Sequence, residues 1–226
     1  MKHCLICLQE LDLFQGLERV QFTNLCQCTK RQKLSKGDYL FHQGETTSTI
    51  YLIKSGKLKL VQNDEGGHET ILDVCGPGEV LGELSLYQEQ NAHSSAIAME
   101  EVCICCFSKI QFESLIKQDP SFALRIIGYL GQKRENILNS GKEAGGTVKE
   151  RLLRLFYRLA EQYGQKRPTL TLIDLKITQQ ELPDMIGSSR EMVIHALNEL
   201  KAANIIDQEK RYYCLKERSL PQCSYF

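Results

Sequence analysis

Short runs of alternating apolar and polar residues fill the chain between Gly37 and about Phe107. The clearest runs span residues 39–41, 50–53, 57–61, 69–74 and 95–98, and turns that contain glycine separate them. Strands of this length, joined by turns at this spacing, are typical of an antiparallel barrel or jelly roll. The first half of the chain is therefore predicted to be a β-domain.

After Pro120 the apolar residues recur every three or four positions, which is the period of a helix. Ile127, Leu130, Arg134 and Ile137 form a seam of the coiled-coil kind. This stripe is too long for a small barrel to cover, so we predict that it forms a dimer interface. Packing of the stripe against the chain's own barrel is the alternative.

Glycines at positions 141, 145 and 146 predict a hinge, and the stripe of another helix runs over residues 148–159. Thr178 and Glu181 have the spacing of a capping box, with Thr178 as the N-cap of a short helix that ends at Gly187. Ser188 or Ser189 then caps a second helix. Two short helices joined through a glycine turn predict a helix-turn-helix, and the basic-aromatic run 210–215 suits the strand of a wing.

Charge is balanced over the 226 residues, with 28 basic and 28 acidic side chains. It is unevenly distributed, because residues 142–226 hold 14 basic and 11 acidic groups whereas residues 1–141 hold 14 and 17. The C-terminal part is thus the candidate for a polyanionic partner. No run reaches transmembrane length and the N-terminus lacks a signal peptide, so we expect a cytoplasmic protein with no membrane partner, whose ten cysteines are reduced.

Several side chains of the predicted helix-turn-helix could reach the edges of DNA bases. The candidates are Thr178, Gln179, Ser188, Ser189, Arg190, Glu191, Ile194 and His195. Arginine can donate two hydrogen bonds to guanine, glutamate can accept from cytosine N4, and histidine can donate to guanine N7 or reach a phosphate. A solvated helix face with an Arg–Glu pair is the alternative interpretation of the same residues.

The run from Gly187 to Leu197, followed by Asn204-Ile205-Ile206, resembles the recognition helix of the cyclic-AMP receptor protein and fumarate–nitrate regulator family. Upstream, residues 37–45, the Gly56 turn and residues 76–84 resemble that family's β-roll, and the match extends from about residue 34 to 220. The resemblance implies an α+β fold. A double-stranded β-roll, which is a jelly roll like that of cyclic-nucleotide-binding domains, precedes a long dimerisation helix and a C-terminal winged helix-turn-helix.

Three segments follow from this resemblance: a sensory β-roll over residues 1–118, a dimerisation helix and hinge over 119–144, and a DNA-binding domain over 145–226. The implied partners are a second copy of the chain, a palindromic double-stranded operator, and RNA polymerase if the protein is an activator. The sequence contains no nucleophile elbow, phosphate loop or paired catalytic carboxylates. We therefore expect a regulator rather than an enzyme.

The resemblance also implies an effector pocket in the β-roll. Its residues would be Gly82, Glu83, Leu84, His93, Ser94, Ile137 and Leu138. In the cyclic-AMP branch an arginine that grips the phosphate stands at the position of His93, and a Thr-Ser pair that contacts adenine stands at the position of Ile137 and Leu138. A neutral imidazole cannot supply the fixed, bidentate charge of an arginine, which argues against cyclic AMP as the effector.

Cysteines offer a second route to sensing, because residues 3–7 resemble the start of the iron–sulfur motif of the oxygen-sensing branch, and Cys105 aligns with its remote ligand. Four of Cys4, Cys7, Cys26, Cys28 and Cys105 could hold a [4Fe–4S] cluster. Leu13 stands where the third ligand is expected, so Cys26 or Cys28 would have to substitute.

Other interpretations of the thiols stay open. Cys4 or Cys7 could form a disulfide switch with Cys214 or Cys223, the first four cysteines could bind zinc, or the cysteines could be structural, with a small molecule other than cyclic AMP in the β-roll. Haem binding through His42, His68 or His93 is a further alternative. The leading prediction is a homodimeric transcription regulator that senses redox state, oxygen or nitric oxide through its cysteines.

Overall fold

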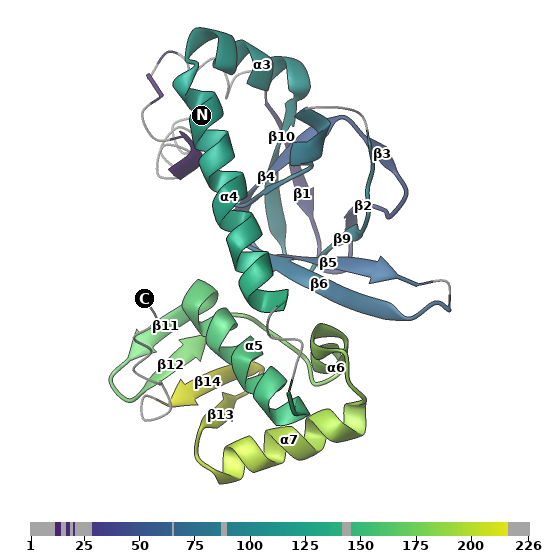
Figure 1. Cartoon of the computed structure of the whole chain (residues 1–226), viewed down its shortest axis with the longest axis vertical. Coiled ribbons are helices and arrows are strands. Elements are labelled where there is room, and N and C mark those ends of the chain that lie inside the picture. The colour runs from purple at the N-terminus through teal and green to yellow at the C-terminus, as the bar shows by residue number, and fades with distance from the viewer. Residues whose placement is uncertain are drawn as a thin grey trace. The chain divides into compact units, whose positions relative to one another are not determined.

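The chain divides into two compact units, residues 1–136 and 137–226 (Figure 1). The computed structural model describes residues 12–14, 17–18, 20, 29–64, 66–86, 90–141 and 146–216. The first unit is rich in antiparallel strands and contains the start of a long helix, and the second combines three helices with a small sheet. The fold is therefore α+β, and no helix within the described ranges is long and apolar enough to cross a bilayer.

Two four-stranded antiparallel sheets form the double-stranded β-roll of the first unit. One sheet has the order β1-β10-β4-β7 and the other β2-β9-β5-β6, while β3 and β8 form a two-stranded ribbon. The strands are β1 (Lys30–Leu34), β2 (Tyr39–Phe41), β3 (Thr46–Thr47), β4 (Thr49–Ser55), β5 (Leu58–Asn63), β6 (Glu69–Cys75), β7 (Val80–Leu81), β8 (Gln90–Asn91), β9 (Ser95–Ala98) and β10 (Val102–Ser108). The five runs predicted from alternation correspond to β2, β4, β5, β6 and β9, which confirms them.

Strand β10 separates two apolar cores, because successive side chains of a strand point to opposite faces. Ile104 packs between the two sheets in one core. Cys105 and Phe107 belong to the other core, which also contains Leu13 and Phe14 of the short 3-10 helix η1 (Asp12–Phe14). This second core lies between the outer face of the sheet and the helices that follow β10.

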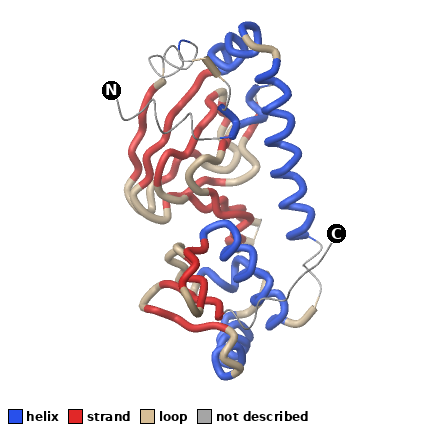
Figure 2. Tube along the Cα trace, turned by 90° about the vertical axis from the view of Figure 1, so that its left-hand side faces the viewer, coloured by secondary structure: helices blue, strands red, loops and turns tan. Residues whose placement is uncertain are grey.

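Helices α3 (Lys109–Gln118) and α4 (Ser121–Gly141) follow β10, and α4 confirms the helix predicted after Pro120. The strands of the β-roll lie on one side of α4 (Figure 2). Phe122 is fully buried against them, and Ile126 and Tyr129 continue the same face. The helix is thus fixed to the β-roll through its first three turns.

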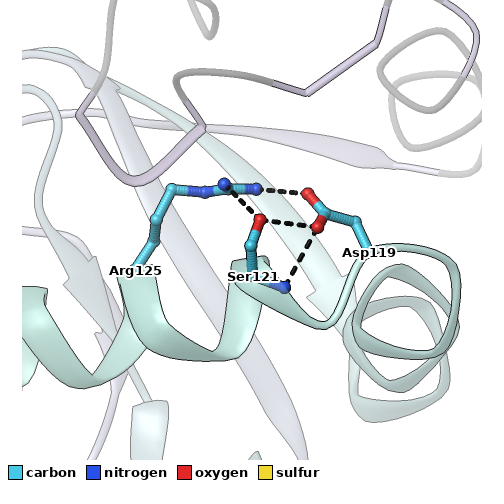
Figure 3. Close-up of polar contacts among 3 residues, drawn as sticks. All are labelled: Asp119, Ser121 and Arg125. Atoms are coloured by element: carbon cyan, nitrogen blue, oxygen red, sulfur yellow. Dashed lines mark hydrogen bonds and ion pairs between the residues drawn. The ribbon is translucent and has the colours of Figure 1, made fainter.

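A network of polar side chains fixes the start of α4 (Figure 3). The Asp119 carboxylate accepts hydrogen bonds from the Ser121 backbone N–H at 3.0 Å and the Ser121 hydroxyl at 2.6 Å. Arg125, one turn further on, donates to Asp119 at 2.7 Å and to the Ser121 hydroxyl at 2.9 Å. The hydrogen bond from Ser121, followed by that from Arg125, lowers the pKa of Asp119, so its carboxylate stays charged at this helix start.

The second unit packs helix α5 (Val148–Tyr163) against a four-stranded antiparallel sheet of order β11-β12-β14-β13. Its strands are β11 (Gly164–Arg167), β12 (Leu170–Ile173), β13 (Ile206–Glu209) and β14 (Tyr212–Lys216). Phe156 of α5 and Tyr213 of β14, both fully buried, have ring centroids 4.8 Å apart. The remaining helices, α6 (Glu181–Ile186) and α7 (Arg190–Ala202), complete a winged helix-turn-helix.

One predicted cap is wrong. Helix α6 begins at Glu181 with Gln180 as its N-cap, and Thr178 is not the cap. The Thr178 backbone N–H and hydroxyl both donate to the Glu181 carboxylate at 2.8 Å, and the Glu181 N–H donates to the Thr178 carbonyl. The Thr178 hydroxyl donates to Glu181 and does not accept a backbone N–H of the helix, as an N-cap would. Thr178 therefore closes a turn ahead of α6. The wing also differs slightly, since β14 starts at Tyr212 and Lys210 lies in the preceding turn at φ 59°.

Candidate nucleic-acid interface and ligand pocket

Helix α7 has one buried and one exposed face. Val193, Ala196, Leu197 and Leu200 are buried against the rest of the second unit. Arg190, Glu191, Ile194 and His195 are exposed, so the structure brings four of the predicted base-contacting residues together on one helix surface. This surface is open to a ligand outside the protein, and His195 on it also contacts Glu199.

The start of α7 is held by its cap and by α5. The Ser189 hydroxyl accepts the Met192 backbone N–H at 3.4 Å, which confirms Ser189 as one of the two predicted caps. Arg151 of α5 donates to the carbonyls of Ile186 and Gly187 at 2.8 and 3.2 Å. Gly187, at φ +61°, ends α6 in the left-handed conformation that favours glycine. The turn between α6 and α7 is thus fixed from both sides.

The other predicted DNA-contacting residues lie elsewhere on the motif. Thr178 and Gln179 are exposed in the turn before α6, Ser188 is half-buried after Gly187, and Ser189 is exposed at the cap. The predicted set therefore has two parts, one at the beginning of each helix of the helix-turn-helix.

A groove of about 600 Å³ separates the start of α5 from α7. Glu199, on its wall, forms ion pairs with Lys149 of α5 and with His195, each at 3.1 Å. The hydrogen bond from Lys149 and, to a lesser extent, the charge of His195 lower the pKa of Glu199, so this carboxylate is ionised at neutral pH. Lys149 and Glu199 are 50 positions apart in the sequence, and no local pattern connects them.

The β-roll contains a smaller pocket, of about 170 Å³. It is lined by Phe41, Thr47, Leu60, Leu81, Gly82, Glu83, Asn91, Ala92, His93, Ser94 and Lys133. Four predicted residues are among them, namely Gly82, Glu83, His93 and Ser94. The side chains of Leu84, Ile137 and Leu138 lie outside the part of the chain that the structure describes.

Lys133 of α4 occupies the polar side of this pocket. Its ammonium lies 2.9 Å from the Glu83 carboxylate and donates to the Val80 carbonyl at 3.2 Å. Tyr129, one turn earlier, accepts the Val80 backbone N–H at 2.8 Å. Burial lowers the pKa of Lys133, but the negative charge of Glu83 outweighs it, so the pKa is raised and Lys133 is charged. A signal for Lys133 does exist in the sequence, since it continues the stripe formed by Phe122, Ile126 and Tyr129.

The β7 turn beside the pocket requires glycine at position 82. Gly82 has φ +76°, and a β-carbon there would collide with the Thr49 carbonyl oxygen. The turn directs Glu83 toward Lys133, so the carboxylate is already paired within the protein. His93, at the position expected to bind phosphate, is exposed. The pocket is also smaller than the roughly 300–1,000 Å³ common for ligand sites.

Of the predicted metal ligands, Cys4, Cys7, Cys26 and Cys28 lie outside the described residues. Cys105 is fully buried in the core that contains Leu13 and Phe14. Among the described residues, no group of three or more His, Cys, Asp or Glu side chains could hold a metal ion. Cys214 is fully buried in β14, and burial raises the pKa of its thiol, which makes it a poor partner for disulfide exchange.

A β-roll followed by a long helix and a winged helix-turn-helix, with an exposed polar face on α7, defines a DNA-binding transcription regulator. Two family models match the chain in this order. The cyclic nucleotide-binding domain matches residues 31–119, and the Crp-like helix-turn-helix domain matches residues 150–222.

Similar proteins agree with this class. The cyclic AMP receptor protein of Thermus thermophilus is 30% identical over 199 residues, which cover 86% of this chain and 87% of that protein. The anaerobic regulatory protein of Bacillus subtilis is 26% identical over 94% of this chain and 87% of its own length. The solved structure of FixK2 from Bradyrhizobium japonicum shares the fold, with a TM-score of 0.72 over 84% of this chain and 93% of that chain at 16% identity. The chain belongs to the cyclic-AMP receptor protein and fumarate–nitrate regulator family of transcription regulators.

Proposed function

We propose that the protein is a homodimeric regulator that inserts the start of α7 into the major groove of each half of a palindromic operator. The exposed face of α7 carries this proposal, because a recognition helix reads base edges with side chains from its N-terminal end. Arg190 and Glu191 stand in the first turn and His195 in the next, all exposed. Arginine has the geometry for guanine and glutamate for cytosine N4.

The opposite face of α4 supports dimerisation. Leu124, Ile127 and Leu130 are 70%, 63% and 36% exposed within the protomer, although neighbouring Phe122 and Ile126 pack against the β-roll. A helix with one apolar face on its own core and a second apolar face open to water fits a symmetric helix pair. Two copies would place two recognition helices on half-sites about 34–36 Å apart.

Replacing Ile127 with glutamate is expected to convert the protein to a monomer. Each copy would bury an unpaired carboxylate, at a cost of about 3–5 kcal/mol for each charge, and the symmetry of the interface doubles this cost. Sedimentation velocity measures the change in mass, and Gln132→Glu adds the same charge at an exposed polar position of α4. A dimeric Ile127→Glu variant would contradict the proposed interface.

Sensing is proposed to occur through cysteines at the joint between the N-terminal segment, β10 and α4. Cys105 shares a core with Leu13 and Phe14 of η1 and with Phe122 of α4. Its burial in apolar surroundings suits a shielded ligand better than a thiol that exchanges disulfides. The similarity to an anaerobic regulatory protein over most of the chain supports the same function.

The residues around Cys105 are compatible with a cluster only if the segments flanking η1 supply the other ligands. Leu13 and Phe14 carry no ligating atom, but they belong to the same core as Cys105. A [4Fe–4S] cluster bound by Cys105 and three of Cys4, Cys7, Cys26 and Cys28 would supply the redox chemistry. The residues of the chain would then transmit a change at Cys105 through Phe122 to the start of α4.

A second candidate is a small effector in the β-roll, favoured by the pocket where Lys133 meets Glu83. An effector that competed for either charge would act on α4 directly, because Lys133 belongs to that helix. Cyclic AMP fits this pocket poorly, since the Glu83 carboxylate is paired and no arginine is present among the lining residues that the structure describes.

Purification without oxygen tests cysteine-based sensing. We expect protein with iron and visible absorption, whose operator affinity changes about 5- to 150-fold on exposure to air. Cys105→Ala should abolish this response, whereas Cys75→Ala, which removes a thiol that is equally buried elsewhere in the β-roll, should keep it. Colourless, iron-free protein with no response to air would overturn cysteine-based sensing. A small effector in the β-roll pocket would then be the remaining candidate, and Lys133→Met would test it.

A further inference from the structure

In the polar network on the wall of the α5–α7 groove, the Glu199 carboxylate pairs with the Lys149 ammonium and also contacts the His195 imidazole, which carries a charge only when protonated. One oxygen of the Glu199 carboxylate lies 3.1 Å from the Lys149 ammonium, and the other lies 3.1 Å from the Nε2 atom of His195. Lys149 and Glu199 are each 42% exposed and His195 is 79% exposed, so water and ions can reach all three. Exposed pairs of this kind contribute little to stability, because water and salt screen the attraction between the charges.

For DNA binding, the position of the network beside the exposed face of α7 matters more than its small contribution to stability. His195 and Glu191 belong both to the exposed face of α7 and to the wall of the groove. A duplex that presents its major groove to this face brings one of the two flanking phosphate strands toward the rim of the protein groove. Lys149 is at that rim, on the first turn of α5.

We propose that Glu199 is a specificity-determining residue, which reduces binding to unselected DNA by keeping Lys149 engaged inside the protein. This inference rests on the proposed reading role of α7. Affinity for unselected DNA comes almost entirely from basic groups that neutralise phosphates, so a carboxylate that occupies such groups lowers that affinity. Sequence-specific contacts by Arg190 do not involve Glu199, so their contribution to the free energy of operator binding is unchanged. The ratio of specific to non-specific affinity therefore rises.

The test uses full-length protein and a random-sequence duplex, with affinity measured by fluorescence anisotropy at about 50 to 200 mM salt. Glu199→Gln keeps the length of the side chain and removes the charge that holds Lys149. We expect this variant to bind the random duplex about 3- to 10-fold more tightly at the lowest salt. The slope of log affinity against log salt should steepen by about 0.9 for each additional phosphate that the variant neutralises.

Two further variants separate this role from a simple change in net charge. Glu113→Gln removes a charge from a comparable exposed pair with Lys109 on α3, and it should leave both affinity and slope unchanged. Glu199→Gln in a Lys149→Met background should lose most of its effect, because the cation it releases is no longer there.

An unchanged slope in Glu199→Gln, or tighter binding that persists undiminished without Lys149, would overturn the role of Glu199 while wild-type binding still supports the proposed function. Failure of the wild-type protein to bind any duplex would overturn the proposed function and this inference together.

Discussion

Replacing Phe122 with alanine is expected to lower the free energy of unfolding of the first unit by about 3–5 kcal/mol. Phe122 is fully buried at the first turn of α4, with its ring centroid 6.0 Å from Phe14 and 5.7 Å from Phe112. The substitution removes the group on which η1, α3 and α4 converge. The loss combines the transfer free energy of the ring with the cost of a cavity that rigid aromatic neighbours cannot fill.

Hydrogen exchange measured by mass spectrometry suits this prediction, because it follows α4 and β10 separately from the second unit. Peptides from both elements should lose protection in Phe122→Ala. Ile110→Ala, on α3 at 75% exposure, should change protection by less than about 0.5 kcal/mol. Equal effects of the two substitutions would contradict the assignment of Phe122 as the anchor of α4.

Replacing Arg190 with alanine is expected to weaken operator binding by about 1–3 kcal/mol for each half-site, or roughly 5- to 150-fold. Arg190 opens α7 directly after the Ser189 cap and is exposed, so its planar guanidinium can donate two parallel hydrogen bonds to a guanine. Loss of these bonds affects recognition at one base position. Loss of a phosphate contact would instead weaken binding to every sequence equally.

The measurement begins with selection of an operator from a random duplex library by the wild-type protein. Anisotropy titrations then compare the selected and unselected duplexes. Arg190→Lys is the matched control, because it keeps the charge but lacks the fork that recognises guanine. It should retain non-specific affinity and still lose specific affinity. A parallel loss on both duplexes would show that Arg190 contacts phosphate rather than a base.

The outcome at α6 illustrates the limit of local patterns. Thr178 and Glu181 do interact, as their spacing predicts, but the threonine hydroxyl donates to the carboxylate instead of accepting from the helix backbone. The sequence motif is compatible with both arrangements, because a hydroxyl is donor and acceptor alike. At Ser189 the same kind of residue does accept the backbone N–H of Met192.

The effector pocket shows how much of a site the sequence can reveal. Resemblance led to Gly82, Glu83, His93 and Ser94, all of which line the pocket. It did not lead to Lys133, because lysine is ordinarily an exposed residue of a helix and its partner Glu83 is 50 positions away. The stripe of Phe122, Ile126 and Tyr129 would have placed Lys133 on the buried face.

Patterns in the sequence were enough to specify some of the elements of this protein: five strands of the β-roll, the helix after Pro120, and the turn at Gly187 that leads into α7. These signals are local, since period, cap and turn residues act within a few positions of one another. The pairing of Lys133 with Glu83, that of Lys149 with Glu199, and the burial of Cys105 beside Leu13 and Phe122 emerged from the folded chain alone. Such contacts join residues that are distant in the chain, and they exist only once sheets and helices have packed and excluded water.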